Sequence, residues 1–262
     1  MVARRYVREI FPTKSVQTRK DNDKELANLL KVFAHMPIDA IAPMHVREYM
    51  DIRGQAAKVR ANREKALLSH IFNKAREWGY TALQNPCQGV RGFKETGRSR
   101  YITDAEFDQV KAHAHFTVID AMDLALLTGQ RPADVLKLKR TDIRDGALWI
   151  VQNKTGQRLG VEVTGELAAV IARIAERARR AISAWLIQDE NGQRLTQYAL
   201  RSRFDKARTL AKVDFQFRDI RAKAATDTGD LAHSQTLLGH KNREMTEHYV
   251  KARIGARVKP LR

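Results

Sequence analysis

The chain has 262 residues, of which 43% are hydrophobic, and it carries 48 Lys and Arg side chains against 30 Asp and Glu. This apolar share excludes global disorder, and the length suits two domains of ordinary size. Both halves are basic, because residues 1–100 hold 20 basic and 10 acidic side chains within a total net charge of +18. A compact protein with this excess repels itself unless it binds a polyanion. Nucleic acid is the first candidate for that partner and an anionic membrane surface the second.

Other classes of protein are excluded by what the chain lacks. The single cysteine, Cys87, excludes an intrachain disulfide and a cysteine-based zinc site. No apolar run approaches the roughly 20 residues of a membrane span. The first residues contain no apolar segment of the kind found in a secretory signal. We therefore expect a soluble, intracellular protein.

The first hundred residues are predicted to be helical. Apolar residues recur at helical spacing from Leu26 to Phe33, with Asp21 or Asp23 as the N-cap. Pro43 marks the start of a second helix, since proline is favoured in a first turn. No strand pattern interrupts this part of the chain, so we predict a small helical domain over residues 1–97.

The third predicted helix has the strongest pattern. Residues 61–78 carry one apolar stripe and end at Gly79, a natural C-terminal cap. Basic side chains, Lys58, Arg60 and Arg63, gather near its start.

A linker is predicted over residues 88–100, which hold three glycines, four basic residues and little that could pack. A second domain, residues 98–262, follows. Its first helix is predicted to begin at Thr103, because Thr103 and Glu106 form a Ser/Thr-x-x-Glu capping box.

The second domain is predicted to be mixed, with helices around one β-hairpin. In chain order the predicted elements are a helix over 117–127 that ends at Gly129, a helix restarting at Pro132, strands over 147–152 and 158–163 joined by a turn at 153–156, helices from Glu166 and Thr196, and short helices broken by Gly229 and Gly239.

Two basic residues in this domain stand in unusual settings. Arg131 lies between a helix-ending glycine and the helix-starting Pro132, where helix N–H groups and a guanidinium would both attract a phosphate. Lys154 occupies the predicted hairpin turn, which suits a proton donor that reaches into a groove. Each residue alone also fits an ordinary exposed position.

Three further positions follow near the end of the chain. Arg218 and Arg221 are three residues apart and are expected to share one helix face, which is either solvated or binds an anion. His240 follows Gly239, whose backbone freedom lets the next side chain turn into a site. Tyr249 comes nine residues after His240. Taken singly, the histidine also fits a helix cap and the tyrosine a core position.

Taken together, these residues stand in the order Arg, Lys, Arg, His, Tyr within distinctive contexts. The contexts are Thr128-Gly129-Gln130-Arg131-Pro132, a strand followed by Lys154-Thr155-Gly156 and a strand, Phe217-Arg218-Asp219-Ile220-Arg221, and Leu237-Leu238-Gly239-His240 with Tyr249 further on. This succession resembles the catalytic domain of the tyrosine recombinase (phage integrase) family. The resemblance spans roughly residues 100–262, and residues 10–95 are more loosely similar to the family's helical core-binding domain.

The resemblance implies a mainly α fold with a small antiparallel β-sheet: a helical core-binding domain and a mixed α/β catalytic domain. It also implies a site-specific recombinase that cleaves and rejoins DNA through a 3′-phosphotyrosyl intermediate, without metal, ATP or any cofactor. Tyr249 would be the nucleophile and Lys154 the general acid, while Arg131, Arg221 and His240 would donate to the phosphate. Asp134 matches an acidic position of the family and would orient Arg131.

One position departs from the family pattern. The family has histidine where this chain has Arg218, in the motif His-x-x-Arg. Arginine donates to phosphate but is a poor general base. Three alternatives follow: proton removal from Tyr249 is handled differently, the enzyme is slow, or the chain is a degenerate, inactive copy.

Partners are also implied by the resemblance. They are double-stranded DNA at an attachment or recombination site, further copies of the chain in a homotetramer on that DNA, and DNA-bending accessory proteins, in the cytoplasm of a bacterial cell near its nucleoid. The tail, residues 250–262, would pack on its own domain or on a neighbouring subunit. Two rival functions remain: DNA relaxation of the type IB topoisomerase kind, and a helical DNA-binding protein without enzymatic activity.

Overall fold

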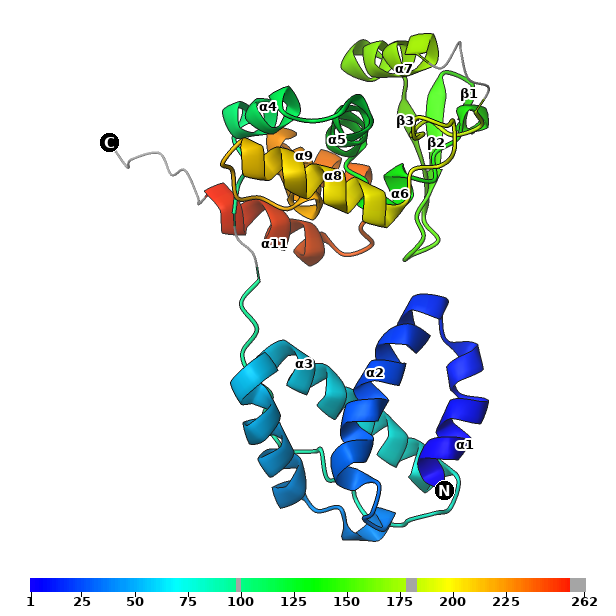
Figure 1. The fold of residues 1–262 in the computed structure, drawn as a ribbon, viewed down its shortest axis with the longest axis vertical. Helices are drawn as coiled ribbons and strands as arrows, with labels where there is room; N and C mark the ends of the chain where they lie inside the picture. Colours follow the sequence, from blue (N-terminus) through cyan, green and yellow to red (C-terminus); the bar gives the residue numbers. More distant parts are fainter. Residues whose placement is uncertain (98–99, 178–182, 255–262) are drawn as a thin grey trace, which may run out of the picture. The chain divides into compact units, whose positions relative to one another are not determined.

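The computed structural model describes residues 1–97, 100–177 and 183–254, with the side chains of His248 and residues 251–254 left aside. The chain divides into two compact units, Met1–Gly97 and Arg98–Arg262, which are described separately (Figure 1). The fold is mainly helical with one small antiparallel sheet, as the sequence predicts. None of the helices in the described ranges is both long enough and apolar enough to span a membrane.

The first unit is built from helices. They are α1 (Val2–Glu9), a 3₁₀ turn (Phe11–Thr13), α2 (Val16–Phe33), a second 3₁₀ turn (Ile38–Ala40) and α3 (Pro43–Glu77). Helix α2 begins earlier than predicted: its N-cap is Ser15, whose hydroxyl accepts the Thr18 N–H, and neither Asp21 nor Asp23 caps it. The sequence did not predict this start, because the polar residues in the first turns of α2 show no apolar periodicity.

The second and third predicted helices carry one label but are two helical segments. Helix α3 (Pro43–Glu77) is divided by a kink at Ala57, where the backbone is not helical, with φ of −157° and ψ of 73°. The basic residues Lys58, Arg60 and Arg63 follow this kink and are exposed. These three cations therefore lie on the surface of the first unit.

The start of the predicted linker is packed, contrary to the expectation for residues 88–100. The ring of Phe93 fills the space beside Gly54, since a Cβ at that glycine would lie 2.2 Å from the ring. The Asn62 side chain bonds the Phe93 N–H and C=O, each at 2.8 Å, and Lys65 Nζ bonds the Val90 carbonyl at 2.5 Å. Val90 also packs against the core of the first unit, so both packing and hydrogen bonds attach this stretch to α3.

The second unit contains the sheet. Its elements are α4 (Asp104–Ala112), α5 (Phe116–Thr128), α6 (Pro132–Val135), a 3₁₀ turn (Arg140–Asp142), β1 (Ile143–Arg144), β2 (Ala147–Val151), β3 (Arg158–Glu162), α7 (Gly165–Arg177), α8 (Gln197–Leu210), a 3₁₀ turn (Phe217–Asp219), α9 (Ile220–Asp227), α10 (Leu231–Leu238) and α11 (Arg243–Ile254). The Thr103–Glu106 capping box at the start of α4 is confirmed. Residues 255–262, the rest of the predicted tail, lie outside the described residues.

Helix α5 forms the centre of this unit. It is buried on almost every side, as expected for a helix with little polar surface, and it packs against α6, α7, α8 and α9. It ends at Gly129 in the left-handed conformation, with φ of 64°. Figure 1 shows the sheet to one side of these helices. The last carbonyls of α5, those of Thr128 and Gly129, accept buried hydrogen bonds and so lie inside the unit.

The hairpin predicted over 147–163 is confirmed, with one added strand. Strands β2 and β3 pair antiparallel with Leu148 opposite Val161, and β1 pairs with the other edge of β2. Leu148 and Ile150 point into the core, while Trp149 and Val151 are exposed, which is the period-2 alternation of a half-buried strand. The sheet thus presents its connecting turn, residues 153–156, at one end.

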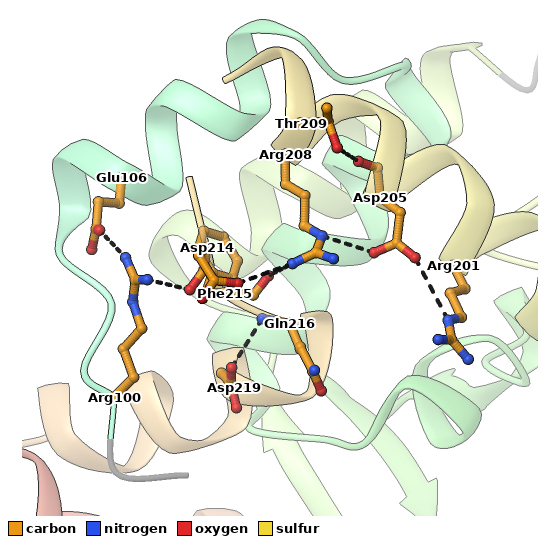
Figure 2. A network of polar contacts seen from close by, with 10 residues as sticks. All are labelled: Arg100, Glu106, Arg201, Asp205, Arg208, Thr209, Asp214, Phe215, Gln216 and Asp219. Atoms are coloured by element: carbon orange, nitrogen blue, oxygen red, sulfur yellow. Dashed lines mark hydrogen bonds and ion pairs between the residues drawn. The ribbon is translucent and has the colours of Figure 1, made fainter. Parts of the chain in front are cut away.

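A polar network holds the segment that leads into α9 (Figure 2). Arg208 on α8 pairs with Asp205 at 2.9 Å and with Asp214 at 3.3 Å, and it bonds the Phe215 carbonyl. Arg100 joins Glu106 and the Asp214 carbonyl. These contacts fix the loop after α8 and so set where the first turn of α9 begins.

Candidate active site

The site forms where two helices end. Arg221, in the first turn of α9, is only 3% exposed. Its Nη1 donates to the Gly129 carbonyl and its Nη2 to the Leu238 carbonyl, both at 2.7 Å. These are carbonyls at the C-terminal ends of α5 and α10, where the helix dipole is negative. The guanidinium is therefore held by two helix ends that the chain brings together.

Two buried glutamines complete this arrangement. Gln152, after β2, donates to Gln130 Oε1 at 2.9 Å and to the Leu238 carbonyl at 2.8 Å. Gln130 in turn donates to the Thr128 and Leu237 carbonyls. Neither glutamine was predicted as a site residue, since a single buried amide leaves no periodic signal in the sequence. Gln152 thus ties the hairpin to the Leu238 carbonyl, which also accepts a hydrogen bond from Arg221.

Arg131 stands at the N-cap of α6, as the glycine and proline around it predict. Helix α6 has only four residues, so the helix end adds less to anion binding than expected. Within the described part of the chain, Nη1 of Arg131 and Nε of Arg221 are buried without a hydrogen-bond partner. Two guanidinium donors are thus left for another acceptor.

His240 is buried beside Arg221. Its Nε2 lies 3.2 Å from Arg221 Nη2, and its Nδ1 lies 2.9 Å from the Thr246 hydroxyl. A guanidinium can only donate, so Nε2 accepts in this arrangement. Burial, with Arg221 and then Arg131 nearby, lowers the His240 pKa to about 4. The ring is therefore neutral at pH 7.

Tyr249 lies on α11, and its ring centroid is 5.6 Å from that of His240. It also acts on Arg221. Burial, followed by the repulsion of Arg131, lowers the Arg221 pKa to about 10, while the charge of Tyr249, that of Asp134 and a side-chain hydrogen bond with Tyr249 raise it. The fold thus brings together four site residues that are spread over 119 positions of the sequence: Arg131, Arg221, His240 and Tyr249.

Lys154 is exposed in the hairpin turn. The root of that turn is fixed to the site in two ways: Gln152 bonds the Leu238 carbonyl, and Asp134 Oδ1 accepts the Asn153 N–H at 2.8 Å. Asp134 was expected to orient Arg131, but its carboxylate holds the hairpin instead, with Oδ2 buried and unbonded among the described residues. Lys154 is therefore carried on a turn anchored at the site.

Arg218 differs from Arg221 in burial. It lies in the 3₁₀ turn before α9 and is exposed, whereas Arg221 is buried three residues later. The two arginines do not share a face as expected, because Arg221 turns inward to the helix-end carbonyls. In the described ranges no group of three His, Cys, Asp or Glu side chains is placed to hold a metal.

Solved structures share this fold. Lambda integrase residues 75–356, solved as a dimer bound to a COC′ core site, matches with a TM-score of 0.84 at 20% identity, covering 93% of this chain and 95% of that one. A lambda integrase tetramer bound to a Holliday junction matches with a TM-score of 0.82 at 20% identity, over 90% of this chain and 72% of that one. The chain therefore has the fold of lambda integrase.

Comparison of the sequence with known proteins identifies the family of this chain. The phage integrase family model matches residues 104–254. The integrase of Escherichia phage HK022 is 30% identical over 251 residues, which cover 90% of this chain and 67% of the phage protein. The chain belongs to the phage integrase family of site-specific DNA recombinases, which confirms the resemblance seen in its motifs.

The depressed pKa of His240 makes the stability of the protein depend on pH. Unfolding returns the ring to a pKa near 6.5, so the unfolded chain takes up this proton first as the pH falls. The contribution is complete above pH 6.5 and is lost as the pH falls toward 4. Urea unfolding at pH 7 and 4.5 should show a loss about 2–3 kcal/mol larger for the wild type than for His240→Asn. Equal losses in both proteins would contradict a neutral buried ring.

Proposed function

We propose that this protein cleaves and rejoins DNA strands through a 3′-phosphotyrosyl bond to Tyr249, without metal or ATP. The observation that carries the proposal is the pair of buried, unbonded donors on Arg131 and Arg221 beside Tyr249 and His240. A phosphodiester under attack develops charge on two non-bridging oxygens, and planar guanidinium groups match such oxygens well. The same guanidinium groups lie beside Tyr249, so the phosphate they bind would be held next to the phenol oxygen that attacks it.

The proposed reaction exchanges one ester for another. The Tyr249 oxygen bonds to phosphorus, the bond from phosphorus to the 5′ oxygen breaks, and Lys154 gives that oxygen a proton. Rejoining reverses these steps with a 5′-hydroxyl as the nucleophile. Because the number of ester bonds is unchanged, the reaction requires no energy from ATP.

The departure at Arg218 leaves proton removal from Tyr249 to another residue. Arg218 is exposed, and a guanidinium cannot accept a proton. His240 is neutral, with Nε2 as its acceptor, and its ring lies beside that of Tyr249. Once phosphate oxygens take the Arg221 donors, Nε2 is free to accept the tyrosine proton. We therefore assign this step to His240.

Duplex DNA at a recombination site is the proposed substrate. The lambda integrase structures contain a dimer on a core site and a tetramer on a Holliday junction, which supports a tetrameric assembly on DNA for this chain. Both units carry excess positive charge, and Lys58, Arg60 and Arg63 lie exposed after the α3 kink. We assign these three cations to phosphate contacts of the first unit.

Trapping of the covalent intermediate tests the proposal. The full chain is incubated with attachment-site DNA nicked close to the cleavage position, so that the short 5′ product diffuses away and rejoining stops. A denaturant-resistant DNA–protein adduct is expected. No adduct on any site-containing DNA would overturn the proposal, and relaxation of supercoiled DNA that lacks such a site would favour the topoisomerase-like alternative.

Lys154→Ala is expected to slow adduct formation by about 10² to 10⁴-fold, because the departing 5′ oxygen then leaves without a proton. DNA whose bridging 5′ oxygen is replaced by sulfur should restore the rate, since a thiolate leaves without protonation. Lys206→Ala, a change at an exposed lysine of α8, is the matched control and should keep the wild-type rate. Failure of the sulfur-containing DNA to rescue Lys154→Ala would argue against the general-acid role.

A further inference from the structure

Thr246 is a buried hydroxyl that the reaction above does not use. It lies on α11 three residues before Tyr249 and has no exposed surface. Its Oγ1 is 2.9 Å from His240 Nδ1. A fully buried hydroxyl in contact with a site histidine restricts that ring. The positions of the hydrogens in this contact determine the role of Thr246.

The protons of this contact can be assigned. Arg221 donates to His240 Nε2, so that nitrogen carries no hydrogen. A neutral imidazole has one hydrogen, which must then lie on Nδ1 and be donated to the Thr246 hydroxyl. Arg221 and Thr246 therefore hold the ring from opposite sides and select the same tautomer.

His240 and Thr246 belong to different parts of the fold. The His240 backbone is fixed to α10, because its N–H bonds the Gln235 carbonyl at 3.0 Å and its carbonyl accepts from Gln235 Nε2 at 3.1 Å. Thr246 belongs to α11, which packs against α9 and α10. The hydrogen bond from Nδ1 to Thr246 thus joins the end of α10 to the helix that carries Tyr249.

We propose that Thr246 is a positioning residue: its hydroxyl holds His240 in the Nδ1–H tautomer and so couples the ring to the seating of the tyrosine helix. The inference rests on the proposed function, in which His240 Nε2 accepts the Tyr249 proton. When α11 is seated, Nε2 is unprotonated and faces the site. When α11 moves away, Nδ1 loses its acceptor and the tautomer is no longer fixed.

The test compares Thr246→Val, which keeps the shape and removes the hydroxyl, with Thr246→Ser, which keeps the hydroxyl. ¹⁵N NMR of the histidine ring in the full chain without DNA reports the tautomer. We expect the Nδ1–H form in the wild type and in Thr246→Ser, and a mixture of tautomers in Thr246→Val. Adduct formation at saturating DNA should fall about tenfold in Thr246→Val, with DNA affinity unchanged and the serine variant near the wild-type rate.

Thr236→Val, a change at an exposed threonine of α10, is the matched control. An Nε2–H tautomer in the wild type would overturn the proposal, even if the valine variant failed to fold. A slow valine variant with an unchanged tautomer would also overturn it, because packing alone would then explain the loss. The absence of any adduct in the wild type would refute the proposed function. The tautomer measurement would still test whether Thr246 fixes the His240 tautomer.

Discussion

Replacement of Tyr249 by phenylalanine will abolish the covalent DNA adduct and leave DNA binding nearly intact. The phenol oxygen is the proposed nucleophile, and no side chain can bond to phosphorus in its place if the assignment is right. Binding should persist because the positive charge is spread over both units and not concentrated at the site. Denaturing gels measure the adduct, and salt-dependent affinity measures the binding.

Tyr198 provides the matched control for this variant. It lies on α8, is 83% exposed, and belongs to the same unit as Tyr249. Tyr198→Phe should form adduct at the wild-type rate. An adduct that survives in Tyr249→Phe would identify another nucleophile and overturn the assignment.

Arg221→Ala should combine a loss of reaction with a loss of stability. Removing one preorganised donor to a transition-state oxyanion costs about 10² to 10³-fold in rate. The change also leaves the Gly129 and Leu238 carbonyls without their guanidinium donors, at about 1–3 kcal/mol of unfolding free energy. Relief of the repulsion between Arg131 and Arg221 offsets part of this cost. Single-turnover cleavage and urea unfolding measure the two effects.

Arg218→Ala distinguishes the contribution of Arg218 from that of Arg221. Arg218 is exposed, so its removal should change the unfolding free energy by less than about 0.5 kcal/mol. The rate should also fall much less than in Arg221→Ala. Comparable losses of rate in both variants would show that Arg218 also contributes to the reaction and would contradict the expectation that Arg221 is the more important of the two.

Local patterns in the sequence determined most of the elements near the site. The α4 capping box, the α5 end at Gly129 and the hairpin around Lys154 each depend on a few adjacent residues, and all three were predicted. The motif order likewise identified the family before any contact was known. Errors arose where the pattern was weak, as in α2, whose first turns are polar.

The chemistry of the site was decided by tertiary structure. The i, i+3 spacing places Arg218 and Arg221 together, yet only Arg221 is buried, because α5 and α10 end at the same point and supply it with two carbonyls. Gln130 and Gln152 became part of the site for the same reason. The sequence alone determined which residues have the chemistry to attack a phosphodiester. Which of them meet, and that His240 accepts where a donor was expected, depended on burial and long-range hydrogen bonds, which local spacing does not encode.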